Sequence, residues 1–245
     1  MISQESSMGY GVRAVVVVAV LALACSWGVA QIGPRYVIEL RSQGGSTEGM
    51  ARGRVQLAGR GMALVRFQGL SVLTVDADTQ SYSDEEARNW PEADLVLVTP
   101  PTAGHFFGLG PLMKPPGRPA IVPLAPGETI SSKGMQLYPM AAWETLDLRK
   151  ANTKLRVTAM AGAQGTRGVA GFMLELGNSR SSYRVYVSCA EDEAAALAQR
   201  LPGADLALVP ARGAPRLLAL NRGAPLKDVP AVLTAAGYAF TADKR

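Results

Sequence analysis

The chain has 245 residues, which suits one domain of ordinary size and an N-terminal leader. Its 25 basic and 20 acidic residues give a net charge of +5, but the basic residues are scattered, and a nucleic-acid interface would need a clustered stripe. His105 is the only histidine and there are two cysteines, which excludes a conventional zinc site rich in His or Cys.

The N-terminus carries a targeting signal. Residues 14–24 are uncharged and apolar, and Gly28-Val29-Ala30 resembles a small-x-small cleavage site. Residues 1–30 are therefore predicted to be a secretory signal peptide, with an uncleaved membrane anchor as the alternative. An imperfect lipobox before Cys25 leaves a lipoprotein as a third interpretation.

The remainder, residues 31–245, is predicted to form a single exported domain, either periplasmic or anchored facing outside the cytoplasm. It would touch the membrane only through the N-terminal segment. After cleavage Cys189 would be the only cysteine, so an internal disulfide is excluded.

The first half of the domain shows a strand-rich pattern. Short β-rich runs separated by glycine-containing turns predict a meander over residues 36–40, 54–57, 62–67 and 70–75. A capping box at Ser83 predicts a short helix ending near Trp90. Residues 93–98 then form an apolar run typical of a buried strand, which Pro100 and Pro101 end. His105 follows directly.

The second half repeats this pattern. Strands are expected at residues 155–160, 171–176 and 183–187, and a capping box at Ser188 predicts a helix that ends at Pro202-Gly203. The sequence ADLALVP at residues 204–210 closely matches ADLVLVTP at residues 93–100. This repetition indicates an internal duplication, as in a sandwich of two sheets.

These segments resemble the metallo-β-lactamase superfamily, whose second motif is a strand followed by T-H-x-H-x-D-H-x-x-G-L. Thr99, His105, Gly108 and Leu109 match that frame. The other three metal-binding letters are replaced here, by Pro100, Thr102 and Gly104.

Residues 54–77 also resemble the opening of the branch that contains N-acyl-phosphatidylethanolamine phospholipase D-like and ascorbate-phosphate lactonase-like proteins. Gly59 matches, Arg60 stands at the histidine position, and Asp76 corresponds to the aspartate. Trp143-Glu144 resembles a W-x-E element of that branch.

The resemblance implies an α/β fold, an αββα sandwich of the metallo-β-lactamase type, after the signal peptide or anchor. It does not carry over the family's hydrolysis through a metal-bridging hydroxide, because most metal ligands are lost. The replaced positions are Arg60, Pro100, Thr102, Gln164 and Ala190.

Two residues are candidates for catalysis, His105 and Cys189. His105 is interpreted as a hydrogen-bonded core histidine, a remnant metal ligand or a general base. The first two are favoured because a base needs a partner that the sequence does not show. Cys189 lies at a predicted strand-to-helix junction, where it is either an inert thiol or half of a Cys–His dyad oriented by Asp76 or Asp205.

Five residues are candidates for ligand binding: Arg60, Asp76, Gln164, Arg167 and Asp205. Arginines in a former metal pocket would favour a small anionic ligand. Asp76 and Asp205 can also be read as turn and cap residues at strand ends.

The predicted function is a non-catalytic protein of the cell envelope that binds a small anionic ligand or a protein partner. No cofactor is expected. The alternative is a hydrolase that uses the Cys–His dyad or one zinc ion held by Asp76, His105 and Asp205. A third interpretation is a structural subunit of a larger complex, anchored by its N-terminus.

Overall fold

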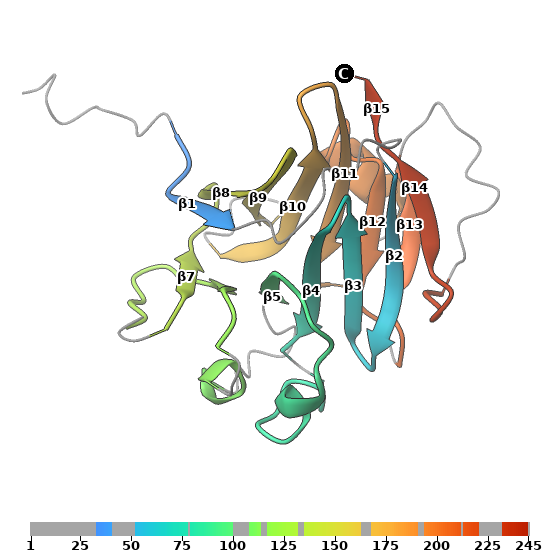
Figure 1. Cartoon of the computed structure of the whole chain (residues 1–245). Coiled ribbons are helices and arrows are strands. Elements are labelled where there is room, and N and C mark those ends of the chain that lie inside the picture. Colours follow the sequence, from blue (N-terminus) through green and yellow to red (C-terminus); the bar gives the residue numbers. More distant parts are fainter. Residues whose placement is uncertain are drawn as a thin grey trace, which may run out of the picture. The chain divides into compact units, whose positions relative to one another are not determined.

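The computed structural model describes residues 33–40, 52–77, 79–99, 108–113, 117–131, 135–162, 168–190, 194–211, 213–220 and 232–244. Residues 35–245 form one compact unit built on two large sheets with few helices (Figure 1). Within the described ranges, no helix is long and apolar enough to cross a membrane. The predicted signal peptide or anchor lies outside those ranges.

The first sheet has eight strands. Its order is β1-β8-β9-β10-β11-β12-β13, with β15 paired to β11. The strands are β1 (Tyr36–Leu40), β8 (Thr145–Lys150), β9 (Thr153–Ala161), β10 (Val169–Gly177), β11 (Ser181–Ser188), β12 (Leu206–Val209), β13 (Arg216–Ala219) and β15 (Asp243–Lys244).

The second sheet has seven strands in the order β14-β2-β3-β4-β5-β6-β7. The strands are β2 (Arg52–Gly59), β3 (Met62–Phe67), β4 (Leu70–Asp76), β5 (Leu95–Thr99), β6 (Ala120–Pro123), β7 (Leu137–Met140) and β14 (Tyr238–Thr241). The predicted meander is confirmed for β2, β3 and β4, and β5 is the buried strand after it. The strand predicted at residues 36–40 is β1, but it lies outside the meander, because it pairs in parallel with β8 in the first sheet. Tight turns close the hairpins, and Gln68-Gly69 turns β3 into β4 with a positive φ at both residues.

The main core lies between the two sheets. Alternate residues of each strand point inward, so Val65 and Phe67 of β3 share one buried cluster with Phe172 and Leu174 of β10. The outer faces carry smaller clusters. Helix α2 (Ala194–Arg200) places Leu197 against the outer face of the first sheet, beside Tyr186.

The helices in the described ranges are short. The helix predicted after Ser83 is only a 3-10 turn, η1 (Glu86–Asn89), in which the Ser83 hydroxyl accepts from the Glu86 N–H at 3.3 Å. A second 3-10 turn, η2 (Gly110–Met113), follows the loop after β5. Two large mixed sheets with few helices fit the predicted metallo-β-lactamase-like αββα sandwich.

The predicted duplication is visible in the strand pairing. β4 pairs in parallel with β5, and β11 pairs in parallel with β12, each after two antiparallel hairpins. Asp94 and Asp205 precede the two parallel strands. The Asp94 carboxylate accepts from the Ser71 N–H at 2.9 Å, and the Asp205 carboxylate accepts from the Arg184 N–H at 2.7 Å. The two ADL segments therefore start their strands by the same side-chain bond.

Candidate ligand site at the strand ends

One end of the sandwich gathers residues from both sheets. β4, β5, β11 and β12 all finish there, and their last residues line a cavity of about 20 Å³, which we call the strand-end cavity. Its polar lining includes Asp76, Thr99 and Ser188, and its apolar lining includes Val209 and Pro210. This volume holds about one water molecule. The chain leaves this end toward residues 100–107 and 191–193, which lie outside the described ranges.

The backbone around Asp76 is firmly held. Its N–H donates to the Gly61 carbonyl at 3.0 Å, and its own carbonyl accepts from both the N–H and the hydroxyl of Thr79. Gly61 has a φ of +62°, and a Cβ there would lie 2.3 Å from the Thr79 methyl, so glycine is required. The turn before β3 thus fixes the backbone of Asp76, which lines the cavity.

Three hydroxyls of the cavity bond to the backbone. The Thr74 hydroxyl donates to the Ala63 carbonyl at 3.2 Å. The Thr99 hydroxyl donates to the Val75 carbonyl at 3.3 Å, and the Ser188 hydroxyl donates to the Ala190 carbonyl at 3.1 Å. The Ala190 N–H in turn donates to the Ser188 hydroxyl at 3.2 Å. These bonds orient the hydroxyls and shape the wall of the cavity.

Cys189 is partly buried but is not part of the cavity lining. Its thiol donates to the Ala170 carbonyl at 2.6 Å, and its N–H donates to the same oxygen at 3.1 Å. Both bonds tie the end of β11 to β10. His105, the partner in the predicted dyad, lies outside the described residues, as do Gln164 and Arg167.

Asp205 lies at the opposite end of the first sheet from the cavity. It precedes β12, whose last residue, Val209, lines the cavity. The four residues of β12 span about 13 Å, so the predicted grouping of Asp205 with Asp76 around one metal is wrong. Asp205 instead acts as a cap residue at the start of its strand, because its carboxylate accepts from the Arg184 N–H.

Arg60 is exposed in the turn between β2 and β3, and it does not contribute to the cavity lining. Its carbonyl accepts a hydrogen bond from the Ser81 hydroxyl. The predicted role of Arg60 as a cation inside a former metal pocket therefore does not fit its position.

A metal fits poorly to the described part of the strand ends. Asp76 supplies one carboxylate there, and Ala190 has a methyl group where the resemblance expects a bridging aspartate. Among the residues that the structure describes, no three His, Cys, Asp or Glu side chains cluster as metal ligands would.

No family model matches the sequence, and no curated protein matches it. Several solved structures are similar, among them three metallo-β-lactamase-fold proteins. One is a B3 metallo-β-lactamase with an active site glutamic acid, with 16% identity, 71% of this chain and 84% of that chain covered, and a TM-score of 0.42. The second is YhfI from Bacillus subtilis, with 12% identity, 64% of this chain and 70% of that chain covered, and a TM-score of 0.40. The third is MEM-A1, a B3 metallo-β-lactamase from a soil metagenome, with 14% identity, 65% of this chain and 76% of that chain covered, and a TM-score of 0.39.

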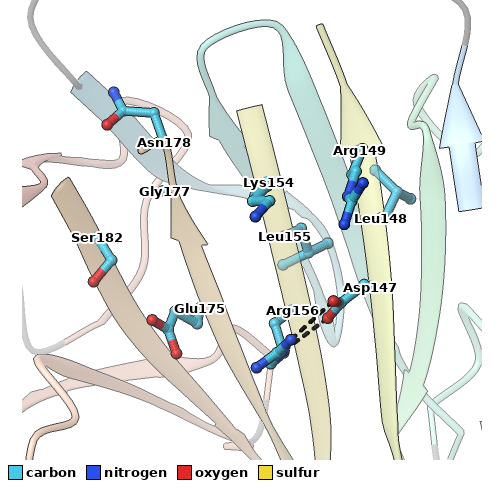
Figure 2. Close-up of a pocket in the computed structure, with 10 residues that line it drawn as sticks. All are labelled: Asp147, Leu148, Arg149, Lys154, Leu155, Arg156, Glu175, Gly177, Asn178 and Ser182. Atoms are coloured by element: carbon cyan, nitrogen blue, oxygen red, sulfur yellow. Dashed lines mark hydrogen bonds and ion pairs between the residues drawn. The ribbon is translucent and has the colours of Figure 1, made fainter. Parts of the chain in front are cut away.

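The sequence interpretation missed a larger cavity on the outer face of the first sheet. This charged hollow has a volume of about 250 Å³. Figure 2 shows its lining residues, whose charged side chains come from β8, β9 and β10. Its charged residues are Asp147, Arg149, Lys154, Arg156 and Glu175. The sequence did contain a signal for this cavity. Charged and apolar residues alternate at 147–149 (D-L-R) in β8 and at 154–156 (K-L-R) in β9, which places all four charges on one face of the sheet.

Proposed function

We propose that the protein is an exported, non-catalytic binding protein with a metallo-β-lactamase-like fold, acting on the cell envelope. The observation that supports it best is the lining of the strand-end cavity, where Asp76 is joined by three backbone-bonded hydroxyls and apolar groups. That lining suits recognition of a polar group better than activation of water by a metal, which needs several metal ligands and an open position. The apolar run at residues 14–24 supports export.

The same end of the sandwich presents an exposed aromatic side chain. Trp143 donates its backbone N–H to the Ala159 carbonyl at 2.7 Å, near the end of β9, and β9 runs in the same direction as β11. The residue is 66% exposed and has a φ of +71°. Left-handed backbone costs a tryptophan energy, and such strain is typical of functional positions. Trp143 therefore supports a partner contact on this end.

Replacing Trp143 by glycine tests whether that strain is real. Trp143→Gly is expected to raise the free energy of unfolding by about 1 kcal/mol, because glycine adopts a positive φ without steric cost. Ala142→Gly is the matched control in the same turn and should lower stability, since Ala142 has no positive φ to relieve. Urea unfolding of both variants measures this. A stability loss in Trp143→Gly would contradict the interpretation of Trp143 as strained.

The metal content of the full chain tests the proposed function. Protein purified without chelator is expected to carry zinc, iron and manganese far below one ion per chain, with no change in Asp76→Ala or His105→Ala. Glu39→Ala, which alters an exposed carboxylate on β1, is the control. Elemental analysis makes the measurement. Near-stoichiometric metal that falls in Asp76→Ala or His105→Ala, but not in Glu39→Ala, would overturn the proposal and favour the hydrolase alternative.

One observation favours the hydrolase alternative. Asp76 of the second sheet and Ser188 of the first sheet line the same cavity, so a carboxylate residue and a hydroxyl residue meet at the strand ends. A hydrolase would have to draw its remaining groups from the loops after β5 and β9, which carry His105 and Gln164.

A further inference from the structure

The charged hollow is built from two rows of residues that cross the first sheet. One row is set by the pairings Asp147↔Arg156, Arg156↔Glu175 and Glu175↔Arg184. Opposite charges alternate at every step of this row, which is the arrangement that stabilises cross-strand neighbours. The guanidinium of Arg156 donates to both Asp147 oxygens, at 2.7 and 2.9 Å, and Arg184 donates to Glu175 at 3.3 Å.

These contacts satisfy the charges of the first row within the protein. The Arg156 hydrogen bonds lower the pKa of Asp147, with partial burial opposing the shift. Asp147 therefore stays ionised at neutral pH, bonded to Arg156 and also attracting Arg149 and Lys154 of the neighbouring row. The first row forms two ion pairs along one wall of the hollow.

The second row breaks this alternation. Arg149 of β8 lies directly opposite Lys154 of β9, and both side chains are exposed on the outer face. Like charges placed opposite each other on neighbouring strands are destabilising. Arg149 reaches Glu39 only at 3.9 Å, with both side chains well exposed, and such a contact contributes little. Among the described residues, Lys154 makes no contact as close as an ion pair. The charges of Lys154 and Arg149 do act on the Asp147 carboxylate, since both help to lower its pKa.

Continuing from Lys154, the same row contains no bulky side chain. Lys154 pairs with Gly177, and Gly177 pairs with Ser182. A Cβ at Gly177 would lie 2.5 Å from the Ser181 carbonyl oxygen, so the backbone itself requires glycine. Gly177 therefore lines the floor of the hollow with backbone atoms, between Lys154 on one side and Ser182 on the other, with Asn178 at the edge (Figure 2).

We propose that the charged hollow binds a small phosphate-bearing ligand, with Arg149, Lys154 and Ser182 as its contacts. Two cations and a hydroxyl donor around a floor without a bulky side chain match the acceptor oxygens of a phosphate group. The dianion would also remove the repulsion between Arg149 and Lys154. The volume lies below the range typical of larger ligands, which favours a phosphate monoester with a short organic part.

The hollow is separate from the strand-end cavity. Lys154 lies near the start of β9 and Ala161 ends it, and seven residues of strand span about 23 Å. Phosphate binding at the charged hollow and metal binding at the strand ends therefore involve different residues, so the result of one experiment does not decide the other.

Isothermal titration of the full chain tests the proposal with inorganic phosphate and glycerol 3-phosphate, each against sodium chloride of equal ionic strength. Saturable binding of at least one phosphate compound is expected, and Lys154→Gln and Arg149→Gln should each weaken it about tenfold. Tighter binding of glycerol 3-phosphate would identify a monoester as the ligand, and equal binding would identify free phosphate. Absence of saturable binding to both would overturn the proposal.

The chain offers a closely matched control. Arg66 of β3 is also exposed and also lies opposite another arginine, Arg54, but it belongs to the other sheet and does not line the charged hollow. Arg66→Gln should leave phosphate binding unchanged. An equal loss in Arg66→Gln would show that only general positive charge attracts phosphate, and this would contradict the proposed site.

Thermal unfolding provides a second test, because a purely structural role of Lys154 would not make the Tm of the protein depend on phosphate. Without phosphate, Lys154→Gln should raise Tm by about 1–2 °C, because it removes a like-charge pair. With phosphate, the wild type should gain stability and Lys154→Gln should gain much less. A lower Tm for Lys154→Gln without phosphate would show that Lys154 has a stabilising structural role, contrary to the proposal.

Discussion

Asp94→Ala is expected to lower the free energy of unfolding by about 3 kcal/mol, because it leaves several partly buried donors without their acceptor. The Asp94 carboxylate accepts from the Ser71 N–H and hydroxyl, and from Lys150 at 2.8 and 2.9 Å. Lys150 also donates to the Gly69 carbonyl at 2.7 Å. The cluster therefore ties the turn of one sheet to β8 of the other.

Two further variants separate the parts of this effect. Asp94→Asn keeps an acceptor for Ser71 but loses the charge that holds Lys150, so an intermediate loss is expected. Asp147→Ala removes an ion pair whose arginine is 53% exposed, and should cost less than about 1 kcal/mol. Guanidinium unfolding ranks the three variants. Equal losses in Asp94→Ala and Asp147→Ala would contradict the assigned importance of the inter-sheet cluster.

Phe240→Ala is expected to cost about 3–5 kcal/mol, the range for removing a buried aromatic ring. Phe240 of β14 stacks on Tyr183 of the first sheet at a centroid distance of 4.1 Å and on Phe67 of the second at 6.1 Å. Its ring also occupies the space above Gly53, where a Cβ would lie 2.1 Å away. The ring thus fastens the C-terminal strand to both sheets.

The matched comparison for Phe240→Ala is Val232→Ala, a truncation of a 51% exposed side chain in the same C-terminal region. This variant should change stability by less than about 0.5 kcal/mol. Chemical denaturation with tyrosine and tryptophan fluorescence as the signal measures both. A loss below about 2 kcal/mol for Phe240→Ala would show that the surrounding rings collapse into the space.

Much of the fold could be predicted from the sequence, because most of its strands show up as local patterns of apolar residues and turns. The run Leu95–Thr99 is apolar at every position but its last, and all five residues are buried, as a central parallel strand requires. The repeated ADL segments predicted the equivalence of β5 and β12, and Asp94 and Asp205 do make the same bond. The helix after Ser83 was overestimated, because capping chemistry marks where a helix can start but not how far tertiary packing extends it.

The candidate site was only partly readable. Asp76, which was singled out by the family resemblance, lines the strand-end cavity. Asp205 was wrongly grouped with it, because the sequence does not say which strand ends of the two sheets come together, and the cavity collects the last residues of the strands whereas Asp205 precedes β12. Arg60 failed for a similar reason, since a position in a tight turn leaves the direction of its side chain undetermined.

The sequence by itself determined the strand-rich sandwich, its internal repetition and the scarcity of histidine and cysteine, since each follows from local periodicity or from composition. Only the tertiary structure decided which charges meet. Arg149 and Lys154 are five residues apart in sequence, but the hairpin register places them opposite each other, and it places Gly177 of β10, which has no side chain, beside Lys154. Cross-strand register depends on the whole sheet, and it was this register that created the charged hollow.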